Sequence, residues 1–407
     1  MTYTAAAPAL SDAGTPGNMG DVRRSNLALV LGRVAQSPPG SHLTRAQIAA
    51  STGLTKASVS SIVLDLLDAG ILREIGLNPQ GERGRPGVGL ALNPARGVIG
   101  MEINVDYIAA GVTDLSGAVV AQEIRERDNR DSESAPVMAA LAALATEVRM
   151  AAMGKGVEVL GGGLAVPGLV DAGNSTVIAA PNLGWLDIKL DLGPLLPGLP
   201  LGVTLFNEAN AAALAELARG PAERHDFLYL SGEVGVGGGL VIGSELFTGP
   251  EGHAGEVGHI VVDPEGSRCS CGGTGCLETI AGQDAIFAAA GIAGKVRSES
   301  MSALVAALAD EKPDALRAVE RAGRSLGVAV ASTARVVNIG AVVLGGHFAV
   351  LERWLRPSLV ESLARYAPGK ILPEHITTAA VGEGGALLGA AGSVVRSLVE
   401  APHRLQP

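Results

Sequence analysis

The sequence predicts a multidomain protein, with a small winged helix-turn-helix head of the all-α type and a larger α/β body. The chain has 407 residues, too many for one small core. Residues 1–96 carry nine basic and six acidic side chains, a net charge of 9 − 6 = +3. The whole chain has a net charge of −10, so the remaining residues carry −13. Helical periodicity before residue 70 gives way to glycine-punctuated strands after residue 97. A basic head on an acidic body indicates that the head alone meets an anion such as DNA.

Residues 1–21 are rich in Ala, Gly, Pro, Thr and Ser and predict a disordered leader. No basic segment leads into an apolar run there, so a secretory signal is not indicated. The longest uncharged stretches, around 192–206 and 336–351, are too short and too polar to cross a bilayer. We expect a soluble, cytoplasmic protein with no membrane contact.

The head is expected over residues 22–95. A stripe of apolar side chains predicts its first helix over 26–36. Thr44 and Gln47 have the spacing of a capping box at the start of a second helix. Gly53 suits the tight turn that follows, because glycine adopts positive φ without strain. Thr55 then caps a third helix, and Gly70 ends it.

Two strands, over 71–75 and 88–92, flank a basic glycine-rich loop and predict a wing. Small polar side chains at the start of the third helix suit a major groove, and an arginine at the wing tip suits a minor groove. A helical protein-interaction module is the alternative, which the wing and the local positive charge disfavour. The expected DNA contacts are basic or small polar residues of the two helices and the wing: Arg45, Thr55, Lys56, Ala57, Ser58, Ser60, Ser61, Arg83 and Arg85.

The body is expected over residues 96–407. Strand–turn–strand segments begin near residues 98 and 227, and each is followed by further α/β structure. A helix is expected over 136–153 and a strand over 158–165. The repeated opening indicates a weak internal duplication.

All three cysteines fall within eight residues, and a histidine precedes them by ten. Three thiolates and one imidazole are the ligand set of a closed tetrahedral zinc site. A disulfide with one spare thiol is the alternative, but nothing in the sequence suggests an oxidising compartment. We therefore predict a structural Zn²⁺ that stabilises the loop 256–278. The expected ligands are His259, Cys269, Cys271 and Cys276.

Several motifs together resemble one known family. They are Glu256-x-Gly-His259, Cys269-x-Cys271-x4-Cys276-Leu-Glu278, Asn207-Glu208-Ala209-Asn210 and Val343-Leu344-Gly345-Gly346. From about residue 22 to its end, the chain resembles the ROK family (repressors, open reading frames, kinases), in its winged-helix, xylose-repressor-like branch. The resemblance implies an actin-like ATPase, sugar-kinase-like body: two α/β lobes with a sugar in the cleft between them.

The resemblance also implies which residues contact the sugar. Carboxylates, amides and imidazoles can exchange hydrogen bonds with several hydroxyls at once. A zinc-bound histidine can offer its second N–H to a ligand. Glu256 and Glu278 have the alternative reading of ordinary surface acids, and Asn182 that of a turn residue after a proline. The implied sugar contacts are Gly168, Asn182, Asn207, Glu208, Glu256, His259 and Glu278.

The motifs that handle ATP in kinases of this family are degenerate. Where a kinase has Asp-x-Gly-x-Thr, the chain reads 102–106 as Glu-Ile-Asn-Val-Asp, without the glycine that lets backbone approach phosphate. The second glycine loop contains Glu233, whose charge disfavours polyphosphate. The catalytic aspartate is replaced by Glu208, which narrows the cleft and favours a small sugar such as xylose. We therefore expect no catalytic residues, and an ATP-dependent sugar kinase with an accessory head is the alternative.

These features predict a sugar-responsive repressor of carbohydrate metabolism. It would bind a pseudo-palindromic operator as a homodimer or homotetramer, with half-sites about one or two helical turns apart. A monosaccharide effector would favour one arrangement of the lobes over another. An activator remains the alternative, because the sequence does not say where the operator lies.

Overall fold

The computed structural model describes residues 19–38, 40–78, 87–221, 224–292, 297–382 and 384–405. The chain forms two compact units. The N-terminal unit comprises Met1–Asn93 together with Ser397–Pro407, and the body unit comprises Pro94–Arg396. The expected domain limits, 22–95 and 96–407, assigned all the C-terminal residues to the body. The structure instead assigns the last eleven to the N-terminal unit.

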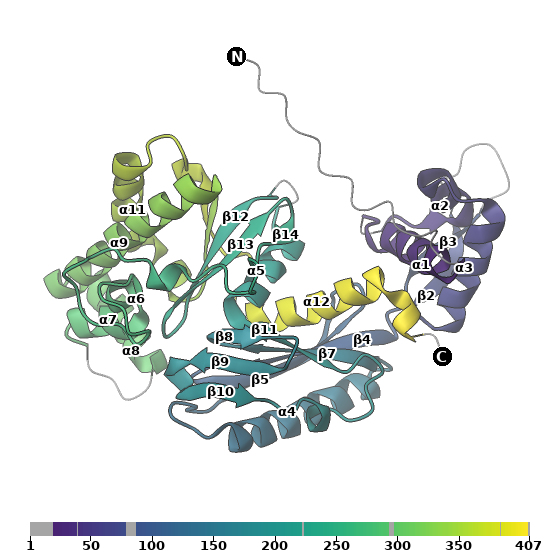
Figure 1. Ribbon diagram of the computed structural model, residues 1–407, viewed down its shortest axis with the longest axis horizontal. Helices are drawn as coiled ribbons and strands as arrows, with labels where there is room; N and C mark the ends of the chain where they lie inside the picture. Colours follow the sequence, from purple (N-terminus) through teal and green to yellow (C-terminus); the bar gives the residue numbers. More distant parts are fainter. Residues whose placement is uncertain are drawn as a thin grey trace, which may run out of the picture. The chain divides into compact units, whose positions relative to one another are not determined.

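Up to Asn93, the described residues of the N-terminal unit form the helices α1, α2 and α3 and a small sheet of strand order β1-β3-β2 (Figure 1). Residues 1–18 of the expected leader lie outside the described residues, but residues 19–21 belong to the first helix. Ion pairs of Arg24 with Asp21 and of Arg23 with Asp65 favour this early start. The elements are α1 (Met19–Ala35), β1 (Leu43–Thr44), α2 (Arg45–Thr52), α3 (Lys56–Asp68), β2 (Leu72–Asn78) and β3 (Gly87–Leu92).

The expected helix caps are confirmed. Thr44 Oγ1 accepts a hydrogen bond from the Gln47 backbone N–H at 3.3 Å, and Gln47 Oε1 accepts one from the Thr44 N–H at 2.9 Å. Gly53 follows α2 with φ of 72°. Thr55 caps α3 by accepting from the Ser58 N–H at 3.1 Å. The helices are therefore fixed by local chemistry that the sequence already carries.

The two strands of the expected wing, β2 and β3, pair antiparallel. The tip between them, residues 79–86 with Arg83 and Arg85, lies outside the described residues. The short strand β1 pairs with β3 on its other side.

The C-terminal residues complete the N-terminal unit. Helix α12 (Gly385–Glu400) belongs to the body unit up to Arg396 and to the N-terminal unit from Ser397. Leu398 is buried, and a methyl group added at Gly32 of α1 would lie 3.8 Å from Val399 Cγ1. The short helix η5 (Pro402–Leu405) follows. Burial of these apolar residues explains why they group with the head.

The body unit is built on two five-stranded sheets (Figure 1). The first has the order β11-β7-β4-β5-β6 and the second β14-β13-β12-β15-β16. In each, an antiparallel meander of three strands continues into two parallel strands. This shared topology confirms the predicted duplication. The first sheet comprises β4 (Arg96–Ile103), β5 (Tyr107–Asp114), β6 (Val119–Glu126), β7 (Glu158–Val166) and β11 (Val203–Asn207). The second comprises β12 (Phe227–Gly232), β13 (Val236–Ile242), β14 (Glu245–Leu246), β15 (Val342–Leu344) and β16 (Ile376–Thr378).

Helices cover both faces of the first sheet. Helix α4 (Ser134–Gly154) packs its apolar side chains against one face, and α12 crosses the other (Figure 1). Of the described helices, α4 alone has the length and apolar composition that could span a membrane. Its buried residues Val137, Leu141 and Leu144 belong to the core of this lobe.

Helices also cover both faces of the second sheet. Side chains alternate between the two faces along each strand, so successive residues pack against different helices. Leu228 and Leu230 face the core formed with α9 (Pro313–Val337) and α11 (Glu352–Tyr366), while Phe227 and Tyr229 face α5 (Glu208–Arg219). The remaining helices are α6 (Glu278–Ala281), α7 (Gln283–Ala289), α8 (Arg297–Ala309), α10 (His347–Val350), η1 (Pro181–Leu183), η2 (Gly193–Leu195), η3 (Val257–His259) and η4 (Pro373–His375). A small antiparallel sheet comprises β8 (Leu169–Asp171), β9 (Thr176–Ala180) and β10 (Trp185–Lys189).

Candidate functional site

The carboxyl ends of three neighbouring parallel strands line one side of a cavity in the body unit. Asn104 follows β4, Gly168 follows β7, and Asn207 ends β11. Parallel strands that are adjacent in a sheet bring the residues after them to one edge, which is where open α/β sheets bind ligands. This topology explains how residues about 100 positions apart come together.

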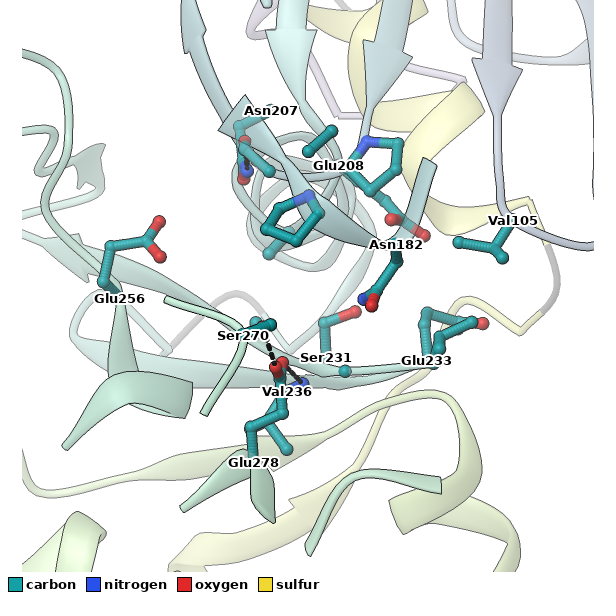
Figure 2. A pocket seen from close by; sticks show the side chains of 18 of the residues that line it. Val105, Asn182, Asn207, Glu208, Ser231, Glu233, Val236, Glu256, Ser270 and Glu278 are labelled. Atoms are coloured by element: carbon teal, nitrogen blue, oxygen red, sulfur yellow. Dashed lines mark hydrogen bonds between the residues drawn. The ribbon is translucent and has the colours of Figure 1, made fainter. Parts of the chain in front are cut away.

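The other side of the cavity comes from the second sheet and from the loop 256–278. Ser231 and Glu233 lie at the end of β12, and Glu256 and Glu278 come from the loop. Figure 2 shows Glu256 and Glu233 toward opposite ends of the opening, with Asn182 and Glu208 between them. The cavity has a volume of about 100 Å³. That is small beside the roughly 300–1,000 Å³ of sites for drug-sized ligands.

Hydrogen bonds of asparagine side-chain amides fix the positions of Asn207 and Glu208. The Asn207 side chain donates to the Gly168 carbonyl at 2.7 Å and caps α5 by accepting from the Asn210 N–H at 2.9 Å. Glu208 Oε1 accepts from Asn104 Nδ2 at 2.9 Å, inside the protein. The Glu208 carboxylate is therefore fixed at the first residue of a helix, facing the cavity.

Two hydrogen bonds hold the Glu278 carboxylate in the cavity wall. Its Oε2 accepts from the Val236 N–H at 3.0 Å, and its Oε1 accepts from Ser270 Oγ at 3.4 Å. A Cβ added at Gly235 would come within 2.1 Å of Glu278 Oε2 and 3.3 Å of Asn182 Nδ2. Gly235 thus allows the carboxylate and the amide to approach the same point, and Asn182 lies in the cavity wall as well as in a turn.

The histidine and the three cysteines form one cluster. Their ligand atoms all lie within 4.8 Å of one another. Cys271 Sγ lies 3.7 Å from Cys276 Sγ, and Cys269 Sγ lies 3.6 Å from His259 Nδ1. Zn–S bonds of about 2.3 Å in a tetrahedron require sulfur atoms about 3.8 Å apart. The donor set and its spacing therefore fit a metal ion such as zinc.

The disulfide alternative is not adopted, since all three cysteines are free thiols. Burial and the neighbouring thiols raise the pKa of Cys276 to about 12, while the Gly273 N–H lowers that of Cys271. A bound cation would favour the thiolate form of both.

His259 joins the metal cluster to the cavity. Its Nδ1 faces Cys269, and its Nε2 lies 3.8 Å from Glu256 Oε2. A metal held through Nδ1 would leave the second nitrogen protonated and directed toward Glu256. Burial raises the pKa of Glu256, His259 lowers it, and Glu278 raises it.

Sequence reasoning missed a buried carboxylate behind the cavity. Glu102 Oε1 accepts from the Tyr107 hydroxyl at 2.6 Å, and Oε2 accepts from the Leu387 N–H in α12 at 3.3 Å. Burial raises the pKa of Glu102, and these two hydrogen bonds lower it; burial also raises the pKa of Tyr107. The sequence signals this residue only through the glutamate at position 102, where a kinase of the family has aspartate. It does not show that Glu102 contacts Tyr107 and Leu387.

The chain aligns with known proteins over most of its length. Residues 98–396 match the model of the ROK family. The chain belongs to the ROK family. It is 32% identical to the xylose repressor of Bacillus subtilis (strain 168) over 327 residues, which are 79% of this chain and 82% of the repressor.

Two solved structures extend the comparison. A ROK family transcriptional regulator, a homologue of the E. coli MLC protein, superposes with a TM-score of 0.76 at 24% identity, covering 94% of this chain and 99% of that one. A ROK family glucokinase from Streptomyces griseus, solved with glucose and AMPPNP, gives a TM-score of 0.61 at 27% identity, covering 74% and 99%. The expected actin-like, two-lobed body is thus confirmed.

The structure brings the seven expected sugar-contacting residues into the wall of one cavity. It adds Asn104, Ser231, Glu233 and Ser270, of which Asn104 and Glu233 had drawn attention in the sequence as departures from the kinase motifs. In the N-terminal unit, Thr55, Lys56, Ala57 and Ser61 are exposed, whereas Ser58 and Ser60 are partly buried. Arg45 pairs with Glu74 at 2.8 Å, so its guanidinium is already engaged.

Proposed function

We propose that the chain is a sugar-responsive transcriptional repressor. The observation that carries this function is the alignment with a xylose repressor over 82% of that protein, including residues outside the kinase-like body. The cavity supports it, because carboxylates, amides and a histidine converge there as a polyhydroxylated ring requires. The effector is a monosaccharide, and the small cavity favours a single ring such as xylose.

In this proposal the N-terminal unit reads the operator. The start of α3 presents Lys56, Ala57 and Ser61 to solvent, and small polar side chains there can approach base edges. Arg83 and Arg85 at the wing tip would contact the minor groove. Arg45 would contribute by positioning β2 through Glu74 rather than by reading a base. A homodimer or homotetramer would match a pseudo-palindromic site.

We also propose that the cluster of His259, Cys269, Cys271 and Cys276 holds a structural Zn²⁺. The four ligands leave no open position for substrate, which distinguishes structural from catalytic zinc. When bound, the ion neutralises the thiolates and fixes the loop that carries Glu256 and Glu278. A cytoplasmic location agrees with reduced thiols.

The glucokinase-like fold keeps a second candidate, an ATP-dependent sugar kinase, in view. Three features disfavour it. Asn104 and Asp106 stand where the first kinase motif has glycine and threonine, Glu233 adds charge to the second loop, and Glu208 replaces the catalytic aspartate. ADP release with a panel of sugars discriminates the two functions.

Fluorescence anisotropy tests the proposed function directly. The full chain is titrated onto DNA from upstream of its own and neighbouring genes, at fixed salt, with and without monosaccharides. We expect specific binding that one sugar weakens. Sugar-dependent ADP release without specific DNA binding would instead support the kinase, and binding that a sugar strengthens would point to activation or co-repression.

A further inference from the structure

The chain passes from one lobe of the body to the other and later returns. The strands of the first sheet end at Asn207 and those of the second begin at Phe227, so the first passage is formed by α5 and the residues after it. The return passage leads from β16 to α12, which packs on the first sheet: a Cβ at Gly100 of β4 would lie 2.1 Å from the Leu387 carbonyl oxygen. Any movement between the lobes must be absorbed here, because hinges are a few residues at the ends of elements.

One buried carboxylate contacts both passages. Glu216, near the end of α5, is only 1% exposed. Its Oε1 accepts a hydrogen bond at 2.7 Å from the N–H of Val381, which lies in the return passage between β16 and α12. Its Oε2 lies 3.7 Å from Nη1 of Arg224, which lies in the first passage just before β12. Two segments 165 positions apart are therefore joined through a single side chain.

Arg224 extends this cluster to the second sheet. Its Nη2 donates to Thr377 Oγ1 of β16 at 3.0 Å, and its guanidinium carbon lies 5.8 Å from the centre of the Phe227 ring of β12. We call Glu216, Arg224, Thr377 and Val381 the interlobe cluster. Desolvation offsets most of the attraction in a buried ion pair, so stability alone does not account for this one.

The ion pair of the cluster is incompletely closed. Glu216 Oε2 and Arg224 Nη1 are both buried, and neither has a hydrogen-bond partner among the described residues. Their separation of 3.7 Å exceeds the roughly 2.7–2.9 Å of a charge-assisted hydrogen bond, so a shift of about 1 Å would close the pair. The cluster can therefore adopt an open and a closed arrangement with a small movement of the first passage against α5.

From this geometry we infer that the interlobe cluster transmits movement of the lobes to α12, with Glu216 and Arg224 as positioning residues. The return passage leads into α12, and α12 continues into the N-terminal unit from Ser397. The hydrogen bond to Val381 thus sets where α12 leaves the passage. The inference rests on the proposed function, because it assigns a route for the sugar response. Neither positioning residue lines the cavity.

Calorimetry and fluorescence anisotropy on the full-length protein test this route. D-Xylose, D-glucose and N-acetyl-D-glucosamine are the probes, and the response is the ratio of operator affinities without and with the sugar that binds. Glu216→Gln and Arg224→Met each remove the ion pair. We expect each to reduce the response at least threefold, while the sugar affinity of the free protein changes less than threefold. The double variant should respond like the single ones, because the two side chains act as one unit.

A destabilised control separates transmission from stability. Val137→Ala opens a cavity in the core of the first lobe, in α4, and should lower the melting temperature but keep the full response. Arg224→Lys keeps the charge without the fork of donors, and it serves as the milder variant if Arg224→Met does not fold.

A full response in the Glu216 and Arg224 variants would overturn the inference and leave the proposed function intact. An equal loss of response in Val137→Ala would also overturn it, since general destabilisation would then explain the effect. A wild-type protein that binds no probe sugar, or whose operator affinity ignores the sugar, would overturn the proposed function and the inference with it.

Discussion

Glu208 is the most buried of the four carboxylates that line the cavity. Its carboxylate is buried, faces the cavity and accepts from Asn104 at 2.9 Å. We expect Glu208→Gln to weaken effector binding about 10- to 100-fold, since a hydrogen bond to a charged group contributes about 1.5–3 kcal/mol. Operator binding without sugar should not change.

Calorimetry and anisotropy on the same preparation check this expectation, with Glu361→Gln, a change of an exposed acid of α11 outside the cavity, as the matched control. A variant that keeps its sugar affinity would show that Glu208 does not contact the ligand. One that loses operator binding as well would indicate a folding defect.

The exposed thiol of Cys271 offers a test of the proposed metal site. Cys271→Ser should lower the zinc content below one ion per chain and reduce the melting temperature by several degrees, because metal binding adds to the folding free energy. Ser267→Ala, an exposed change in the same loop, should have neither effect. Zinc analysis and thermal unfolding measure both. A Cys271→Ser protein with full metal content and unchanged melting would contradict the proposal.

At this scale the sequence predicted residue types and their spacing well, but not their partners. The cysteine cluster was visible because its ligands are close in the chain. The contact of Asn104 with Glu208 was not, because 104 residues separate them and only the parallel strands β4, β7 and β11 bring them together. Glu102 and Tyr107 were missed for a different reason: they are close in the sequence, but their contact matters only because Glu102 is buried.

Among the elements, α12 and α5 pack closely against each other. A Cβ at Gly389 of α12 would lie 1.6 Å from the Ala211 carbonyl oxygen of α5. Gly389→Ala should therefore lower the free energy of unfolding by about 3 kcal/mol or more, at or above the usual range for overpacking.

The same helix provides the control. Gly392 has no atom within 4 Å of an added Cβ, so Gly392→Ala should be neutral or stabilise by up to about 1 kcal/mol. Denaturant unfolding of both variants measures the difference. Equal stabilities would show that the two helices separate without cost.

The elements themselves were largely predictable. The helix caps and turn glycines of the N-terminal unit act locally, and so their positions follow from a few neighbouring residues. The expected start of the first helix at residue 26 was wrong by seven residues, since α1 begins at Met19. The ion pair of Arg23 with Asp65, which favours the earlier start, joins residues far apart in the sequence. The order of the strands in each sheet could not be predicted, because it depends on pairing between strands that are distant in the sequence.

For the whole molecule, the proposed function predicts that the two units can be separated by mutation. Deletion of Ser397–Pro407 removes residues of the N-terminal unit, including buried Leu398. We expect operator affinity to fall at least tenfold, while calorimetry still detects the effector. A truncated chain with full operator affinity would show that these residues do not support DNA binding.

The assignment of the last residues to the N-terminal unit also has a consequence for how the protein is made. The body is in effect an insertion between the two parts of that unit. Domains fold as they leave the ribosome, N-terminal first, at about 5–20 residues per second. Here the N-terminal unit cannot be completed until Ser397–Pro407, the last residues to be translated, have left the ribosome. A prematurely terminated chain would hold the cavity but lack a finished head, so only a fully translated protein would occupy the operator.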